Sequence, residues 1–325
     1  MKLISFKTSD GQVNIGSYLT QNDCVVNFTQ ADASAMFKDM LSLIDAGETG
    51  LLCARELEAK ALIVHSIQSI EILAPLLNAR RLRDCLVFEK HIRQSRSNRY
   101  LFGQGKEKID PATIEIPKAW YKKPGYYKGN LFSIIGTNAN VYWPEYSQVI
   151  DYELEVALVT SKQGKNVSIE NANDYIYGYM IFNDFSARDA QYLEMQTGLG
   201  PSKGKDFDTG NSIGPWLVTK DEITNSQDLV MVARINGEEW SRGSTSEMQH
   251  DFKSIICHAS DSETFYAGEI IGSGTVGGGC GNEQGRFLKN GDQVELEVTG
   301  LGILKNKIVA PHVQQPPKLP LNIFE

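Results

Sequence analysis

Two glutamates separated by one residue, inside an otherwise apolar run, constrain this chain most strongly. Glu153 and Glu155 lie in the run IDYELEVALV, residues 150–159. Because alternate side chains of a β-strand share a face, a strand here would place both carboxylates side by side. Two such anions repel each other unless a cation lies between them. A third carboxylate, Asp184, follows the apolar run 179–182. These oxygen donors at strand ends predict a magnesium or calcium site, with a solvated strand face as the alternative.

The composition is that of a globular protein with an acidic balance. Of the 325 residues, 41% are hydrophobic and 22% are charged, and the net charge is −8. That length supplies a large core and allows one large domain, or one domain plus a smaller one. The densest basic patch, residues 93–99, is short. We therefore expect no nucleic-acid partner.

The beginning of the chain and its cysteines predict a cytoplasmic protein. Residues 1–6 lack the apolar stretch of a signal peptide, and no run reaches transmembrane length, so no membrane partner is expected. The five cysteines are scattered, with no CxxC pair. This usage is typical of a reduced protein with neither a disulfide framework nor a zinc finger.

The residue pattern predicts a β-rich α+β fold with a small N-terminal domain. Residues 1–80 combine short strands, turning at Asp10-Gly11, with helices over 31–46 and 49–61. Residues 81–325 begin with a helix over 83–93. Six strand-like runs follow, namely 149–160, 177–182, 216–219, 229–235, 270–274 and 293–298. Regular alternation of strands and helices is absent, which favours α+β over a doubly wound sheet.

One apparent nucleotide motif is a chance match. Residues 272–277 fit GxGxxG. A dinucleotide site needs that motif to open a helix within a βαβ unit. The next residues, Gly278–Asn282, are too rich in glycine to sustain a helix. We therefore expect no nucleotide site here.

Several short motifs, taken in order, resemble the fumarylacetoacetate hydrolase family over residues 81–309. They are DYELE at 151–155, NDFSARDAQ at 183–191, GKDFD at 204–208, GPW at 214–216, GEIIGSGT at 268–275 and Gly291-Asp292. The resemblance implies the mixed β-sandwich roll of that family for residues 81–325. It also implies a divalent cation, usually Mg²⁺, with Ca²⁺ or Mn²⁺ as alternatives.

The resemblance implies four metal ligands and a catalytic pair. The ligands would be Asp84, Glu153, Glu155 and Asp184. Asp84 could instead be an acidic residue at a helix N-terminus, favoured by the helix dipole. The pair would be His91 as general base and Glu283 as its partner.

Two alternatives to that pair remain open. His91 could be an exposed helical histidine. Glu89 could replace Glu283, although on a helix it would face away from His91.

The same resemblance places Arg188, Gln191 and Lys205 around a substrate pocket. Arg188 could clamp a carboxylate with two hydrogen bonds. Gln191 and Lys205 could stabilise negative charge that develops on oxygen. The alternative for Arg188 is an ion pair with Asp189, and Lys203 competes with Lys205 for its role.

Three hydroxyl groups complete the expected pocket. Tyr126 or Tyr127, and Thr275, would contact the substrate. The family usually has the sequence Gly-Tyr-His-Gly-Arg near these tyrosines, and a tyrosine at the position of Leu86. Those departures leave the exact substrate open.

The reaction implied by the resemblance is hydrolysis of a carbon–carbon bond. The substrate would be an anionic 1,3-diketo acid such as fumarylacetoacetate or an acylpyruvate, with water activated by His91 and Glu283. The alternative is isomerisation or decarboxylation of a 2-oxo dicarboxylic acid, of the oxaloacetate or 2-hydroxyhepta-2,4-diene-1,7-dioate type. A non-enzymatic binding protein is a third interpretation. A homodimer is expected from the resemblance alone.

Overall fold

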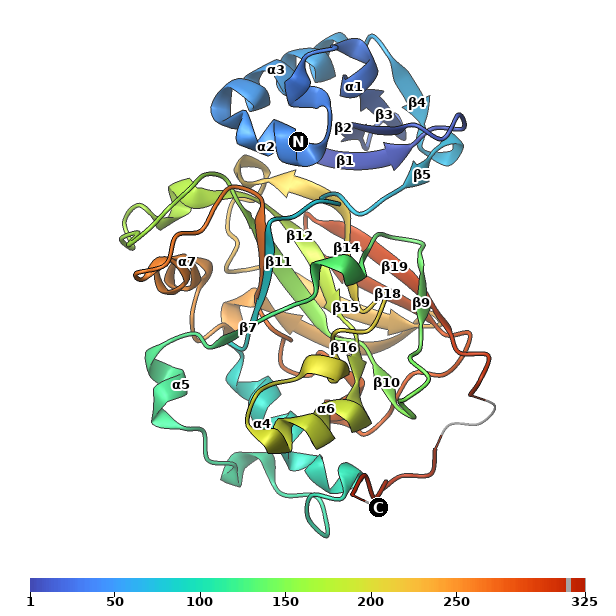
Figure 1. The fold of residues 1–325 in the computed structure, drawn as a ribbon, viewed down its shortest axis with the longest axis vertical. Coiled ribbons are helices and arrows are strands. Elements are labelled where there is room, and N and C mark those ends of the chain that lie inside the picture. Colours follow the sequence, from blue (N-terminus) through green and yellow to red (C-terminus); the bar gives the residue numbers. More distant parts are fainter. Residues whose placement is uncertain (314–316, 325) are drawn as a thin grey trace.

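In the computed structural model, which describes residues 1–313 and 317–324, the first 72 residues form antiparallel strands covered by short helices (Figure 1). The predicted turn at Asp10-Gly11 joins β1 to β2. β1 also pairs with β14 (Asn211–Thr219), so the sheet continues into the rest of the chain. The boundary at residue 80 stays a prediction. The elements of this unit are β1 Lys2–Lys7, β2 Val13–Leu19, β3 Cys24–Asn27, α1 Phe28–Ala31, α2 Met40–Asp45, α3 Gly47–Lys60, β4 Val64–Ser66 and β5 Glu71–Ile72.

The single helix expected over residues 31–46 is wrong. The segment holds α1, a short 3-10 turn at Ala35–Phe37 and α2. Asp32 accepts a hydrogen bond from the backbone N–H of Ser34, and Asp39 accepts one from Ser42. Such local side-chain bonds compete with a continuous helix. The second expected helix, 49–61, is present as α3.

A 12-stranded sheet runs through the molecule and carries the acidic motifs. Its path is β4-β3-β2-β1-β14-β12-β11-β17-β6-β7, with β5 and β8 at its side. β11 and β12 are buried along their whole length, which explains their nearly continuous apolar sequence. The strands not yet bounded are β6 Arg81–Cys85, β7 Tyr126–Lys128, β8 Ile134–Ile135, β11 Leu154–Thr160, β12 Ile176–Asp184 and β17 Glu269–Gly272.

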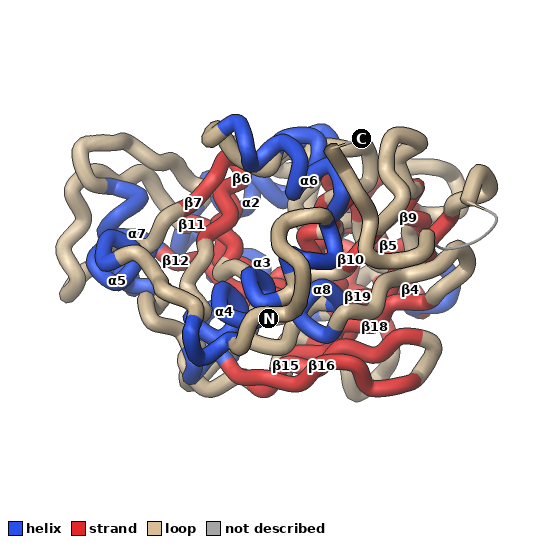
Figure 2. Tube along the Cα trace, turned by 90° about the horizontal axis from the view of Figure 1, so that it is seen from below, coloured by secondary structure: helices blue, strands red, loops and turns tan. Residues whose placement is uncertain are grey.

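A second, five-stranded sheet packs against the first. Its order is β16-β15-β18-β19-β9, and Figure 2 shows β15, β16 and β18 running side by side. A two-stranded ribbon pairs β10 (Ile150–Asp151) with β13 (Ser186–Ala187). The strands of the second sheet are β9 Asn140–Tyr142, β15 Val230–Ile235, β16 Glu238–Ser244, β18 Gln293–Val298 and β19 Gly302–Val309.

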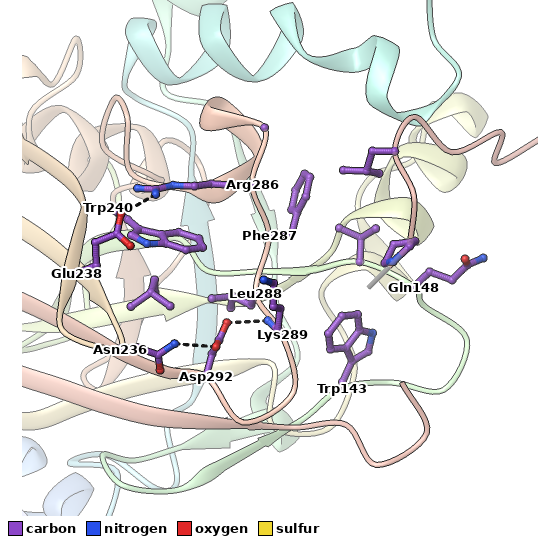
Figure 3. A pocket seen from close by; sticks show the side chains of 15 residues that line it. Trp143, Gln148, Asn236, Glu238, Trp240, Arg286, Phe287, Leu288, Lys289 and Asp292 are labelled. Atoms are coloured by element: carbon purple, nitrogen blue, oxygen red, sulfur yellow. Dashed lines mark hydrogen bonds and ion pairs between the residues drawn. The ribbon is translucent and has the colours of Figure 1, made fainter. Parts of the chain in front are cut away.

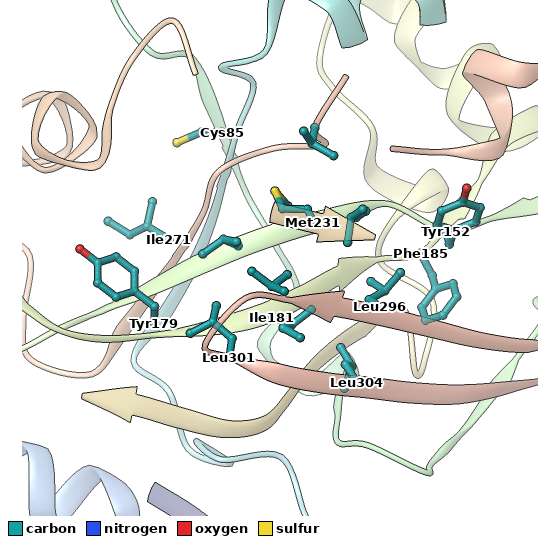
Figure 4. Packing of buried hydrophobic residues seen from close by; sticks show 14 of the residues in the cluster. Cys85, Tyr152, Tyr179, Ile181, Phe185, Met231, Ile271, Leu296, Leu301 and Leu304 are labelled. Atoms are coloured by element: carbon teal, nitrogen blue, oxygen red, sulfur yellow. The ribbon is translucent and has the colours of Figure 1, made fainter. Parts of the chain in front are cut away.

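The main hydrophobic core fills the space between the two sheets (Figure 4). Ile181 of β12 and Met231 of β15 meet Leu296 and Leu304 there, all at most 1% exposed. This sandwich confirms the β-rich mixed fold. The remaining helices are α4 Glu89–Ser97, α5 Lys118–Lys122, α6 Arg188–Glu194, α7 Phe252–Ser260 and α8 Gly281–Gln284. Within the described ranges, every helix is too short or too polar to cross a bilayer.

The helix expected over 83–93 is also wrong, and the difference matters for the site. Residues up to Cys85 form β6, and α4 begins at Glu89. β6 pairs in parallel with β17, with Asp84 opposite Gly272. This pairing between distant segments overrides the local helical pattern. Asp84 therefore ends a strand inside the sheet and is not an acid at a helix N-terminus.

Candidate active site

Three buried carboxylates converge where neighbouring strands of the large sheet end. Asp84 of β6, Glu155 of β11 and Asp184 of β12 each offer an oxygen within 4.8 Å of the other two. The backbone N–H of Gly274 donates to Asp84 at 3.2 Å and to Glu155 at 3.0 Å. The Oδ1 atom of Asp184 is buried without a hydrogen-bond partner in this part of the chain. Glu155 is fully buried, so a solvated strand face is excluded.

The electrostatics of this cluster favour a cation. Burial, and then the charge of Asp184, raises the pKa of Asp84 from 3.8 to about 8. Burial likewise raises the pKa of Asp184 to about 6 and that of Glu155 well above its usual value. A divalent ion would relieve this repulsion and satisfy the unpartnered oxygen of Asp184. The donors are all oxygen, which suits a hard cation.

Gly272 makes room for two of these carboxylates. A Cβ atom at this position would lie 2.4 Å from Oδ1 of Asp84 and 3.0 Å from Oε2 of Glu155. Any larger residue at position 272 would therefore displace Asp84 from the cluster. The glycine at the start of the GxGxxG match thus has a steric role beside the carboxylates.

Glu153 lies next to the cluster but faces two cations of the chain itself. Its carboxylate contacts Nζ of Lys205 and lies 2.7 Å from Nη2 of Arg188. Burial alone would raise the pKa of Glu153, but the charges of Lys205 and Arg188 outweigh it and lower the pKa to about 2. Lys205 also lies 2.7 Å from Oδ2 of Asp184. Lys205 therefore links Glu153 to the cluster, and the ligand role of Glu153 stays a prediction.

His91 and Glu283 meet as the resemblance implied. Nδ1 of His91 lies 3.2 Å from Oε1 of Glu283, although the angles fall outside hydrogen-bond geometry. The carboxylate of Glu283 accepts the backbone N–H groups of Gly278 and Cys280, both at 3.0 Å, which fixes its orientation. Glu89 pairs instead with Arg93 at 2.7 Å. His91 is only 7% exposed, so neither alternative fits the structure.

A cavity of about 280 Å³ is lined by His91 and by two of the carboxylates, Asp84 and Glu153. One wall is polar and the other is largely apolar, with Leu86, Trp120 and Met195 contributing to it. An enclosed space of this size suits a small substrate held beside a few polar groups. The lining residues are Asp84, Cys85, Leu86, His91, Trp120, Gly125, Tyr126, Tyr127, Glu153, Gln191, Met195, Pro201, Lys205 and Thr275.

The three expected hydroxyl residues line the cavity, but their hydroxyls are already engaged. Tyr127 donates to Oδ2 of Asp184 at 2.6 Å, and Tyr126 donates to Glu263 at 3.2 Å. Thr275 donates a long hydrogen bond of 3.4 Å to Oε1 of Glu155. Tyr127 and Thr275 thus hold the metal-site carboxylates in place. Their contact with substrate stays a prediction.

Arg188 lies behind the cavity wall and does not line the cavity among the described residues. Its Nε and Nη2 atoms both lie 2.8 Å from Oδ2 of Asp151. Its Nη1 donates to the amide oxygen of Gln191 at 2.9 Å. Asp189 instead accepts hydrogen bonds from Ser147 and the backbone of Gln148. The pairing with Asp189 is therefore excluded, and the predicted clamp on a substrate carboxylate has no support from this geometry.

Replacing Arg188 by methionine should destabilise the protein strongly. The change would leave Asp151 buried without its cation and Glu153 with Lys205 alone, which costs about 3–5 kcal/mol. The exposed arginine Arg242, paired with Glu239, provides the control, where methionine should leave the stability almost unchanged. Urea unfolding of both variants measures the difference, and equal losses would contradict a bracing role.

The metal-free protein should lose stability as the pH rises. Because burial raises the pKa of Asp84 from 3.8 to about 8, the folded chain holds a proton that the unfolded chain has released. The free energy of unfolding therefore falls between about pH 4 and about pH 8. Thermal unfolding in a chelating buffer measures this trend. Saturating Mg²⁺ should reverse it, and a melting temperature that rises across this window without metal would contradict it.

A second cavity, of about 510 Å³, lies elsewhere and carries none of the expected site residues (Figure 3). Trp143, Trp240 and Phe287 contribute to its walls. Two of its charged side chains, Arg286 and Glu238, form an ion pair at 2.9 Å. We assign the chemistry to the smaller cavity because His91 and Asp84, a member of the carboxylate cluster, both line it.

Sequence analysis missed Asp151 and the apolar cavity wall. Asp151 accepts hydrogen bonds from the backbone N–H groups of Gly281 and Asn282, in addition to Arg188. Asp151 therefore links α8, the helix that carries Glu283, to β10. Its place two residues before Glu153 was a usable signal. Trp120 and Met195 lie in segments without any motif, so nothing in the sequence marked them.

Comparison with known proteins finds relatives that match most of the chain. The chain is 30% identical to oxaloacetate tautomerase fahd2 of Xenopus laevis over 95% of this chain and 90% of that protein. It is 30% identical to oxaloacetate tautomerase FAHD2A of Homo sapiens, over 88% and 84%. Both names specify mitochondria.

A solved structure and a family model extend the comparison. The structure of a fumarylacetoacetate hydrolase from Exiguobacterium antarcticum superposes with a TM-score of 0.75 at 26% identity, covering 95% of this chain and 99% of that one. The family model for the fumarylacetoacetate (FAA) hydrolase C-terminal region matches residues 85–309. The chain therefore belongs to the fumarylacetoacetate hydrolase family.

Proposed function

We propose that this chain is a Mg²⁺-dependent enzyme that interconverts the keto and enol forms of a 2-oxo dicarboxylic acid such as oxaloacetate. The observation that carries the proposal is one cavity lined both by His91, which lies beside Glu283, and by Asp84 of the buried carboxylate cluster. The named activity of relatives that match almost the whole chain supports this substrate class. These relatives favour the isomerase alternative over the hydrolase reaction that the family resemblance implied.

Asp84, Glu155 and Asp184 would hold the cation, with Glu153 joining them if Lys205 moves aside. When bound, a divalent cation supplies a Lewis acid that polarises the 2-oxo group and stabilises negative charge on its oxygen. Burial raises the pKa values of the Asp84 and Glu155 carboxyl groups, so a bound cation would stabilise their charged forms.

Proton transfer falls to His91. In the keto-to-enol direction, Nε2 of His91 takes a proton from the carbon next to the ketone, and the proton is then returned to the ketone oxygen. The reaction is an isomerisation, so no water or second reactant enters. Glu283, held by two backbone N–H groups, lies 3.2 Å from Nδ1 of His91, where its negative charge would stabilise the charged imidazole.

Gln191 and Lys205 are placed to bind the substrate oxygens. The amide oxygen of Gln191 accepts from Arg188, which leaves its amide nitrogen to donate into the cavity. Nζ of Lys205 lies between Glu153 and Asp184 on the cavity wall. Both groups can stabilise charge on oxygen as the enolate forms. Leu86 and Trp120 shield the opposite side from water.

Hydrolysis of a 1,3-diketo acid is the second candidate. It is favoured by the likeness to a fumarylacetoacetate hydrolase and by the same base, which could equally activate water. Both reactions pass through an enolate, so the carboxylates do not discriminate between them. The homodimer and the cytoplasmic location remain predictions, and the names of two relatives point to mitochondria.

The test compares three reactions in one preparation. Loss of the enol absorbance of oxaloacetate should accelerate with Mg²⁺ and protein beyond the rate with Mg²⁺ alone, and a chelator should remove the effect. Pyruvate release measures decarboxylation, and loss of the diketone absorbance measures cleavage of acylpyruvates and fumarylacetoacetate. Cleavage without any enol conversion would replace the proposal by the hydrolase reading.

A further inference from the structure

A thiol without an assigned role lies beside the proposed base. His91, Cys280 and Glu283 each offer a ligand atom within 4.8 Å of the other two, and all three residues are buried. Cys280 is completely buried and forms no disulfide. The keto–enol chemistry uses the histidine and the glutamate but not this sulfur atom.

The nitrogen of His91 that faces this group lacks a hydrogen-bond partner among the described residues. Its Nδ1 lies 3.2 Å from Oε1 of Glu283, but the alignment is not that of a hydrogen bond. The Glu283 oxygens already accept two backbone N–H groups. Two lone pairs that face each other in a buried place repel unless a proton or a metal ion lies between them.

We propose that His91, Cys280 and Glu283 form a second metal site, which binds a soft divalent ion such as Zn²⁺. Nitrogen, sulfur and carboxylate oxygen are the ligands that zinc takes in proteins, whereas Mg²⁺ prefers oxygen alone. The two sites therefore differ in ligand chemistry as well as in position. Because a neutral imidazole that binds an ion through Nδ1 carries its proton on Nε2, the occupied site would leave His91 unable to accept a proton from a substrate.

Binding of the ion is a balanced exchange with a proton. The thiol of Cys280 loses its proton to solvent as the metal–sulfur bond forms, since the thiolate is the ligand. His91 binds through the neutral Nδ1 lone pair, and Glu283 binds as the carboxylate. No oxidant or other reactant is needed.

Co²⁺ provides a spectroscopic probe for this site. With the carboxylate cluster first saturated by Mg²⁺, Co²⁺ titrated into the whole protein should produce the near-ultraviolet charge-transfer band of a cobalt–thiolate bond, and Zn²⁺ should displace it. Cys280→Ser should lose the band. Cys85→Ser is the matched control, because Cys85 is also buried, lines the cavity and adjoins Asp84, and this variant should keep the band.

A second variant guards against misfolding of the serine variant. Glu283→Gln preserves the shape of the side chain and should keep the band while weakening Co²⁺ binding at least about 10-fold. Both variants are first shown to unfold at the same temperature as the natural protein. A band that survives in Cys280→Ser, a band that is lost in Cys85→Ser, or Co²⁺ binding without any thiolate band would each overturn the proposal.

Occupation of this site would also block the base, a consequence that rests on the proposed function. Zn²⁺ should inhibit enol conversion, and excess Mg²⁺ should not relieve the inhibition. Cys280→Ser should be inhibited less than the natural protein, each relative to its own rate without Zn²⁺. Relief by Mg²⁺ would place the ion in the carboxylate cluster and overturn the site. The Co²⁺ spectrum stands whether or not the protein is a tautomerase.

Discussion

Replacing Glu155 by glutamine is expected to abolish tight Mg²⁺ binding and, at the same time, to stabilise the metal-free protein at alkaline pH. Both effects come from one carboxylate. Glu155 is fully buried within 4.8 Å of the oxygens of Asp84 and Asp184. With metal it supplies a ligand, and without metal it repels its neighbours.

The expected sizes follow from burial. Loss of even an outer partner of a ligand costs roughly 10–100-fold in metal affinity, so loss of the ligand itself should cost more. Burial raises the pKa of Glu155 well above its usual value, so the metal-free protein must bury an extra charge as the pH rises. Glutamine mimics the protonated side chain, accepts from Gly274 as the carboxylate does, and removes that charge. The gain should be on the order of 1–4 kcal/mol.

Two measurements on two variants test this prediction. Calorimetric titration with Mg²⁺ gives the affinity, and thermal unfolding near the alkaline end of the range, with and without Mg²⁺, gives the stability. Glu297→Gln is the control, since Glu297 also lies on a strand but pairs with Arg234 at the surface. If Glu155→Gln lowers the free energy of unfolding of the metal-free protein by as much as it lowers the free energy of Mg²⁺ binding, the carboxylate has a structural role and the proposed metal site is wrong.

The acidic strand motif could be understood from sequence because its information is local. The apolar runs around Glu155 and before Asp184 were enough to place these two carboxylates at strand ends, although Glu153, expected beside Glu155 on the same strand, precedes β11. Their burial follows from the position of β11 and β12 inside a sheet covered on both faces. A local apolar pattern is enough to predict a buried strand when the strands on either side of it are also apolar.

Asp84 shows where local reasoning fails. Its segment has helical spacing, but residues 81–85 form a strand because β17, more than 180 residues away in the sequence, offers a parallel partner. Only the family resemblance placed Asp84 among the ligands. Its position opposite Gly272 depends on this pairing, which no window of the sequence contains.

Arg188 shows the same limit for charge. From the sequence its nearest carboxylate is Asp189, yet in the structure Arg188 of α6 pairs with Asp151 and Glu153, more than 30 residues earlier in the chain. The sequence analysis therefore assigned Arg188 to substrate binding, because its two buried carboxylate partners are distant in the sequence. The wall formed by Trp120 and Met195 could not be predicted either, because cavity walls are made by segments that meet only in the fold.

Replacing His91 by alanine should reduce enol conversion by about 10²–10⁴-fold, the usual contribution of a general base. Mg²⁺ affinity should stay unchanged, because the Asp84, Glu155 and Asp184 cluster does not include this residue. The substitution opens space at the wall of the cavity, so added imidazole should restore part of the rate.

The His91→Ala prediction separates the rate of enol conversion, which should fall, from Mg²⁺ binding, which should not change. His65→Ala is the matched control, since His65 lies on β4 in the N-terminal unit and should leave both quantities as they are. The initial rate at saturating substrate and a Mg²⁺ titration are measured for each variant. Full activity in His91→Ala would assign proton transfer to another group, and Lys205, the other titratable nitrogen on the cavity wall, would then be the residue to replace. Loss of activity together with loss of Mg²⁺ binding would instead mean that His91 supports the fold of the site, and imidazole would then fail to restore the rate.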